Sequence, residues 1–296
     1  MKNILASIGF ILAFLAIYMG LQIWYIVSVQ FIISFMKAFE AGLAGDVTPD
    51  LEKITVSIQE AMKIHLPVAL IFSAVLAALI YYFICRARKQ NIVEVCAFNP
   101  ISFKSAIVFV FTGISFLFFN GSLNTLIYES GYLNDSFQQL ESTFAPFYEG
   151  NFLLSFASIA IVVPLIEEII FRGLIQNELR KHMRVLPAVL IQAALFGLYH
   201  LNLAQFIITV FMGIMLGLLC VWTKSIWGAI IIHGVNNALS FLFAWFEPEA
   251  TQESYFFLNY IFLALTTLII AAVMVYFFRR RGEAADQSPQ TSEVSV

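Results

Sequence analysis

Charged residues are scarce in this sequence, and their scarcity excludes most soluble folds. Asp, Glu, Lys and Arg make up 12% of the 296 residues, against about 25% in soluble domains, while hydrophobic residues reach 60%. A protein that meets water on most sides needs more polar surface than this composition supplies. The mean hydropathy of +0.86 agrees, so the surrounding medium is expected to be lipid.

Two further features of the composition limit the classes of function that the sequence allows. The formal net charge is -3 and no basic arm or patch is present, which argues against a nucleic-acid partner. The cysteines are few and form no CxxC pair, so neither a disulfide framework nor a thiolate metal site is expected. The first apolar run is too long for a signal peptide and lacks a small-residue cleavage site, so it is interpreted as a retained span.

The sequence instead contains long, continuous apolar runs. In a bilayer, backbone polar groups must be satisfied within helices or a closed barrel, and barrel strands alternate apolar and polar residues. The runs show no such alternation, so an all-α fold is predicted. About 20 apolar residues cross the hydrocarbon core. The sequence therefore predicts a polytopic transmembrane bundle of about eight spans, at residues 4–34, 66–85, 105–127, 151–174, 187–201, 203–222, 225–246 and 256–278.

The basic residues predict the orientation of these spans. Cytoplasmic loops carry an excess of Lys and Arg. With both termini inside, the outer segments hold only three of the 16 Lys and Arg residues: Lys37, Lys53 and Lys63. Both termini are therefore predicted to be cytoplasmic. A short chain with a retained first span favours the bacterial plasma membrane as its location.

Four regions follow from this pattern. Residues 1–150 are interpreted as N-terminal transmembrane helices with an outer loop, and residues 151–246 as the region that carries the chemistry. Residues 247–278 form the last transmembrane helix, and residues 279–296 a polar, disordered cytoplasmic tail. In the outer loop, apolar residues recur at helical spacing over residues 51–63. They predict either an interfacial amphipathic helix or a helix packed on the spans.

Three groups of polar side chains lie inside the predicted spans, where an ionisable group costs about 2.5–3.5 kcal/mol on insertion scales. The first is EEIIFR at residues 167–172. Positions four apart share a helix face, so Glu168 and Arg172 are expected to form an ion pair. Glu167 points about 100° away and stays available for chemistry. The alternative is that both acids only balance Arg172 at the membrane boundary.

The second and third groups lie in the fifth and seventh spans. Phe196 and His200 share a helix face, as do His233 and Asn237, with Asn236 beside them. Considered singly, His200 is a structural hydrogen-bonding residue, and the third group is polar contact between helices.

The predicted depths of the three groups in the membrane indicate that they belong to one site. At 1.5 Å per residue, Glu167 and His233 lie about 11–12 Å from the cytoplasmic boundary. His200 is nominally deeper, at about 20 Å, unless the short fifth span is tilted or shifted. A carboxylate and two imidazoles at similar depth describe a site with a general base and charge-stabilising groups.

In this order and spacing the three groups resemble the signature EExxxR, FxxxH and HxxxN of the CAAX prenyl-protein endopeptidases and their bacterial relatives, the CPBP (Abi) membrane proteases. The resemblance covers residues 151–240. The matching residues are Glu167, Glu168, Arg172, Phe196, His200, His233 and Asn237. The resemblance implies a membrane-embedded endopeptidase that acts on a membrane-associated, in some members prenylated, protein or peptide. Residues 151–246 would be its protease core.

The resemblance also implies roles. Glu167 and His200 would activate the attacking water, and His233 and Asn237 would donate to the oxyanion. Structural support would come from Glu168, Arg172 and Phe196. The family has been described both as metalloproteases and as glutamate-type proteases, so no cofactor is certain. Glu167, His200 and His233 could ligate Zn²⁺ with a water. The absence of HExxH, with only one such ligand per helix, favours metal-independent chemistry.

Two functions of other classes remain open from the sequence. A non-catalytic membrane scaffold or bacteriocin-immunity protein would keep the same motifs for packing. A transporter or channel would use the carboxylate and imidazoles as a proton relay. Against a transporter, no internal repeat and no paired broken helices are evident.

Overall fold

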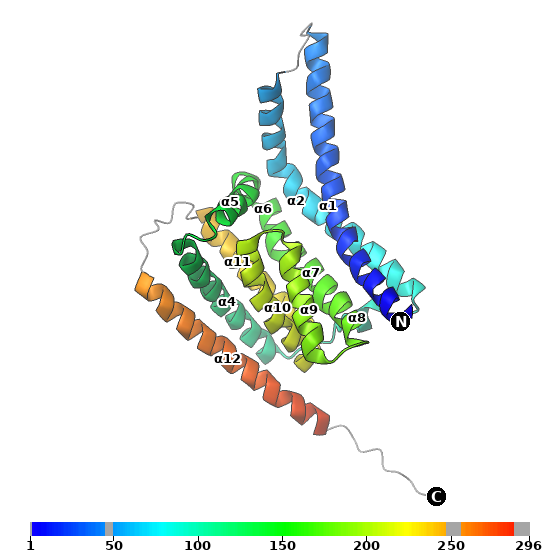
Figure 1. The fold of residues 1–296 in the computed structure, drawn as a ribbon, viewed down its shortest axis with the longest axis vertical. Coiled ribbons are helices and arrows are strands. Elements are labelled where there is room, and N and C mark those ends of the chain that lie inside the picture. The colour runs from blue at the N-terminus through cyan, green and yellow to red at the C-terminus, as the bar shows by residue number, and fades with distance from the viewer. Residues whose placement is uncertain (1, 45–49, 247–255, 287–296) are drawn as a thin grey trace, which may run out of the picture.

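The computed structural model describes residues 2–44, 50–246 and 256–286, and all regular structure in them is helical (Figure 1). Two wide π-helical segments are labelled η. The elements are α1 (Lys2–Leu43), α2 (Leu51–Ala87), α3 (Ile92–Val95), α4 (Phe103–Glu129), α5 (Asn134–Glu149), α6 (Phe152–Phe156), η1 (Ala157–Val162), α7 (Val163–Glu168), η2 (Ile169–Ile175), α8 (Gln176–Arg180), α9 (Val185–Tyr199), α10 (Leu203–Thr223), α11 (Trp227–Phe246) and α12 (Phe256–Asp286).

Seven helices in the described residues are long and apolar enough to cross a membrane. They are Ile4–Leu43, Leu51–Ala87, Phe103–Glu129, Phe152–Arg180, Leu203–Thr223, Trp227–Phe246 and Leu258–Arg280. The fifth predicted crossing, residues 187–201, corresponds to α9, an apolar helix of 15 residues. The predicted all-α polytopic bundle of about eight spans is confirmed.

The hairpin of α1 and α2 extends well beyond the other helices (Figure 1). The 42 residues of α1 measure about 63 Å, roughly twice the hydrocarbon thickness of about 30 Å. Residues 51–63, predicted as a separate helix of an outer loop, are instead the first part of α2. Asp50 caps this end by accepting backbone N–H groups of the first turn. The helix continues through Pro67, so this segment and the predicted span at residues 66–85 form one helix.

The C-terminal helix is longer than the sequence suggested. The predicted disordered tail began at residue 279, whereas α12 continues to Asp286. Arg, Glu and Ala dominate this extension and are good helix formers, which explains the difference. The remaining predicted tail, residues 287–296, lies outside the described residues, as does the predicted start of the last region at residues 247–255.

The fourth crossing is interrupted by two wide turns that isolate the short helix α7. Segment η1 ends directly before α7, which has Pro164 in its first turn. Proline has no N–H and its ring clashes with the carbonyl four residues earlier, so the α-helical pattern is broken there. Segment η2 follows directly after Glu168. Wide turns of this kind are frequent at functional sites, and here they flank both carboxylates of the EExxxR group.

One end of the bundle collects basic side chains. Arg88 follows α2, Arg180 ends α8 and Lys224 follows α10. The connecting segments meet there, because the backbone N–H of Ile226 donates to the carbonyl of Ala97 at 3.0 Å. We call this the basic end of the bundle.

Helices α9 and α10 approach each other closely through small residues. A Cβ added to Gly213 of α10 would lie 2.8 Å from the Cβ and 2.9 Å from the Cα of Ala193 on α9. Small residues at a helix interface let two backbones pack tightly in a membrane. This contact sets the position of α9, which carries Phe196.

We expect Gly213→Ala to destabilise the protein by about 1–3 kcal/mol, the usual cost of overpacking. The added methyl group would separate α9 from α10. Thermal unfolding in detergent measures the loss. Gly121→Ala is the matched control, because a Cβ at Gly121 meets nothing within 4 Å. Equal unfolding midpoints for the two variants would contradict the proposed close contact.

Candidate active site

Glu168 is the buried centre of a polar cluster formed by α7, η2 and α11. Its Oε1 accepts a hydrogen bond from Arg172 Nη1 at 2.9 Å, which confirms the ion pair expected from their spacing. The same oxygen lies 2.8 Å from His233 Nδ1. All three side chains are buried. Because an ionised carboxylate only accepts, Nδ1 of His233 carries a proton and donates it to Glu168.

Glu167 faces the other nitrogen of the same imidazole. Its Oε2 lies 3.8 Å from His233 Nε2 and has no hydrogen-bond partner among the described residues. With Nδ1–H directed to Glu168, a neutral His233 presents the Nε2 lone pair towards Glu167. A water molecule or substrate atom between these two groups could contact both.

The ring of Phe196 on α9 packs against the cluster. It is fully buried, and the Arg172 guanidinium lies over it, 4.4 Å from its centroid. The Phe196 centroid lies 5.0 Å from the ring of His200 and 5.9 Å from the ring of His233. A desolvated cation–π contact contributes about 2 kcal/mol. Phe196 therefore connects α9 to the polar groups of η2 and α11.

His200 lies in the short turn between α9 and α10. Its Nδ1 is 2.8 Å from the Phe196 carbonyl oxygen, so Nδ1–H donates and Nε2 is an acceptor. Asn202 fixes the turn: its Oδ1 accepts the Gln205 backbone N–H at 3.0 Å, and its Nδ2 donates to the Ser136 carbonyl of α5 at 2.7 Å. Within the described residues, no hydrogen bond or ion pair joins His200 to Glu167.

Asn237 of α11 belongs to a chain of amides. Asn120 Nδ2 of α4 donates to Asn236 Oδ1 at 3.0 Å, and Asn236 Nδ2 donates to Asn237 Oδ1 at 3.1 Å. This chain directs the donor end of the Asn237 amide towards η1, where it reaches the Ile159 carbonyl at 3.3 Å. The sequence identified Asn237 but gave no role to Asn120.

The three candidate zinc ligands do not form a metal-binding group. In the part of the chain that the structure describes, no three or more His, Cys, Asp and Glu side chains are placed to hold a metal ion. Glu167 approaches His233 Nε2 at 3.8 Å, and among the described residues no hydrogen bond or ion pair joins His200 to Glu167 or His233. A catalytic zinc site needs three protein ligands around one point. The arrangement of Glu167, His200 and His233 does not fit that requirement.

Two tyrosines that the sequence analysis missed lie beside Glu167. Tyr18 of α1 and Tyr199 of α9 stack with ring centroids 6.3 Å apart, and both interact electrostatically with Glu167. Their hydroxyl groups are buried without a partner among the described residues. Tyr199 directly precedes His200, which could have drawn attention to it. Tyr18 lies in an apolar run far from every motif, and no sequence signal marks it.

Polar atoms without partners concentrate in this cluster. The described residues contain twelve buried side-chain nitrogen and oxygen atoms without a hydrogen-bond partner, and six belong to it. These six atoms are Tyr18 Oη, Glu167 Oε2, Glu168 Oε2, Arg172 Nε, Arg172 Nη2 and Tyr199 Oη. Each such group costs about 1–3 kcal/mol of desolvation. A ligand that satisfies them would recover part of this free energy, which is typical of a functional site.

The fold and the buried cluster together define a polytopic membrane protein with an intramembrane polar site. Residues 149–239 match the family model described as "Type II CAAX prenyl endopeptidase Rce1-like". Over these residues the chain is therefore similar to the CAAX prenyl endopeptidase (CPBP) family. The matched region contains all three motifs.

Two curated relatives support this similarity. The membrane-embedded CAAX protease MroQ of Staphylococcus aureus (strain USA300) is 32% identical over 111 residues, covering 35% of this chain and 44% of that protein. YdiL of Bacillus subtilis (strain 168), named "Putative membrane peptidase", is 36% identical over 78 residues, covering 26% of this chain and 32% of that protein. The chain thus matches less than half the length of either relative. No solved structure matches it.

We expect Glu168→Gln to destabilise the protein by about 3–5 kcal/mol, because it leaves the buried Arg172 charge unpaired. The adjacent variant Glu167→Gln removes a carboxylate without a hydrogen-bond partner and should cost far less. Thermal unfolding of both variants in the same detergent measures the difference. An equal loss of stability would show that Glu168 does not have the special role that its contacts indicate.

Proposed function

We propose that this protein is an intramembrane endopeptidase that hydrolyses a peptide bond of a membrane-associated substrate with a water molecule activated by Glu167. One observation carries the proposal: an unpartnered buried carboxylate faces the Nε2 of an imidazole that a second, ion-paired carboxylate holds in place. The match of residues 149–239 to the family model supports the reaction class.

Glu167 would act as the general base. Water between Glu167 and His233 would give a proton to the Glu167 carboxylate while its oxygen attacks the peptide carbonyl. Glu167 would then pass the proton to the amine that leaves, which returns the carboxylate to its starting state. General acid–base catalysis of this kind contributes about 10²–10⁴ in rate.

His233 and Asn237 would stabilise the oxyanion of the tetrahedral intermediate. For Asn237 the support is its amide orientation, since Asn236 holds Oδ1 and leaves Nδ2 as the presented donor. The Asn237 bond to the Ile159 carbonyl is long, at 3.3 Å, and could be exchanged for a stronger one to an oxyanion. For His233 the support is the position of Nε2, which faces the space beside Glu167. In this role His233 would be an imidazolium, which keeps Nδ1–H on Glu168 and offers Nε2–H to the oxyanion.

His200 would assist Glu167 in placing the water. Its Nδ1–H is bound to the Phe196 carbonyl, so Nε2 can accept a hydrogen bond from water. Among the described residues no hydrogen bond or ion pair joins His200 to Glu167. The substrate and the attacking water would lie between these two side chains.

The substrate would be a protein or peptide that reaches the site from the membrane. The name of MroQ describes a CAAX protease, which favours a substrate cleaved near a lipid-modified cysteine. The excess of Lys and Arg at the basic end supports a cytoplasmic position for that end in a bacterial plasma membrane.

We expect Glu167→Gln to lower cleavage at least 10²-fold while the protein remains folded, because glutamine cannot take the proton from water. Wild type and variant, purified in nanodiscs, are incubated with prenylated and unprenylated membrane peptides. Mass spectrometry then detects the new termini. Glu141→Gln is the control, because that carboxylate is exposed on α5.

The same experiment separates the alternative functions. Cleavage retained in Glu167→Gln would exclude the proposed base. Intact peptides from folded wild type throughout the panel would instead favour a scaffold or immunity protein that keeps the motifs for packing.

We expect a strong zinc chelator to leave the cleavage rate unchanged, because the three candidate ligands are not gathered around one point. The measurement compares the wild-type rate before and after chelation, and after restoring Zn²⁺. Loss on chelation with recovery on adding Zn²⁺ would show that the ligands come together in the working enzyme.

A further inference from the structure

A cavity of about 450 Å³ lies at the basic end of the bundle, and Arg172 is among the residues that line it. The segment after α2, the chain from η2 through α8, and the connection from α10 to α11 line it. Arg88, Lys181 and Lys224 of this lining directly follow the ends of spans, which is the level at which lipid headgroups lie. Its size is within the range of small-ligand sites, about 300–1,000 Å³.

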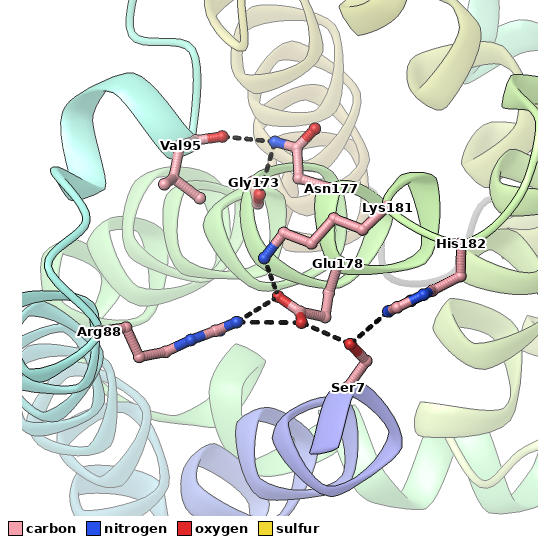
Figure 2. A network of polar contacts seen from close by, with 8 residues as sticks. All are labelled: Ser7, Arg88, Val95, Gly173, Asn177, Glu178, Lys181 and His182. Carbon is pink, nitrogen blue, oxygen red and sulfur yellow. Dashed lines mark hydrogen bonds and ion pairs between the residues drawn. The ribbon is translucent and has the colours of Figure 1, made fainter. Parts of the chain in front are cut away.

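A network around Glu178 of α8 builds one wall of the cavity (Figure 2). Arg88 Nη2 donates to both Glu178 carboxylate oxygens, at 2.9 and 3.0 Å, and Lys181 Nζ donates at 2.6 Å. Ser7 of α1 donates to Glu178 at 2.7 Å and contacts His182 at the same distance. These bonds tie α1, α2 and α8 together, so the wall is formed in advance of any ligand.

A second contact fixes the neighbouring wall. Asn177 Nδ2 donates to the carbonyls of Val95 and Gly173, which joins α8 to the segment after α2 (Figure 2). The cavity is therefore enclosed by elements that are connected to one another by hydrogen bonds.

The lining of the cavity is positively charged. It contains five cationic side chains, Arg88, Arg172, Arg180, Lys181 and Lys224, and two acidic ones, Glu94 and Glu178. Glu178 already pairs with Arg88 and Lys181. Within the described residues, no carboxylate forms an ion pair with Arg180 or Lys224. The excess positive charge is thus concentrated on these two side chains.

The side chain of Arg172, which belongs to the candidate active site, also lines the cavity. It is 2% exposed, and its Nε and Nη2 have no hydrogen-bond partner among the described residues. Only Nη1 is used, in the bond to Glu168. Guanidinium donors in this state favour an acceptor that carries negative charge.

We propose that this cavity binds a phosphate group, supplied either by an anionic lipid headgroup or by a soluble phosphate. Phosphate matches the chemistry of several convergent Arg and Lys donors. The location at the ends of the spans brings the cavity to the depth of phospholipid headgroups. The proposal concerns binding and stands apart from the proposed peptidase activity.

The test uses the full-length protein in a neutral detergent, titrated with short-chain phosphatidylglycerol, short-chain phosphatidylcholine or inorganic phosphate at constant ionic strength. The thermal unfolding midpoint reports binding, because a ligand of the folded state raises it. The test variant is Arg180→Gln with Lys224→Gln, two exposed positions that should not affect folding. The control is Lys104→Gln, an exposed lysine near the same end but outside the cavity.

We expect phosphatidylglycerol to raise the midpoint of wild type and Lys104→Gln, and the apparent affinity to fall about fivefold for each charge removed in the double variant. A matching response to inorganic phosphate would assign the site to free phosphate, and a response to phosphatidylglycerol alone would assign it to lipid. Equal responses in the double variant and the Lys104→Gln control, or no response in wild type, would overturn the proposal.

Discussion

The ion pair between Glu168 and Arg172 is the constraint on which the site depends. Both side chains are fully buried, so neither charge can exist there without the other. Glu168 then uses the same oxygen to hold His233 Nδ1, and this bond decides which imidazole nitrogen faces Glu167. A motif that balances charge in the membrane therefore also sets the geometry of the candidate catalytic groups.

The helices around this pair explain why it can be held so rigidly. The wide turns η1 and η2 lie on either side of α7. Glu167 and Glu168 of α7 face different nitrogens of the His233 imidazole. Phe196 fills the space beside Arg172 and contacts both histidine rings. The close approach of α9 and α10 at Gly213 in turn positions Phe196. Gly213, which lies outside the polar cluster, and Phe196, which packs against it, thus help to determine where the polar groups lie.

The sequence predicted the parts of the structure that depend on local spacing. The Glu168–Arg172 pair and the Phe196–His200 contact follow from positions four apart on a helix, and the spans follow from apolar length. Contacts between distant segments could not be predicted in this way. Tyr18 reaches Glu167 only because α1 packs against the fourth crossing, and Asn120 reaches Asn236 only because α4 packs on α11. Helix ends were also misjudged, since polar residues with good helix propensity extend α2 and α12.

The Arg172 side chain takes part in both the candidate active site and the cavity at the basic end, so it connects these two regions. One guanidinium nitrogen binds Glu168 in the candidate active site, while the side chain also lines the cavity at the basic end. An anion that reached Nε and Nη2, which have no hydrogen-bond partner among the described residues, would hold the guanidinium in place for Glu168. Nη1 is already directed to Glu168, so a ligand on the other two nitrogens strengthens the arrangement without displacing it. On these contacts, occupation of the cavity would order the site and not disrupt it.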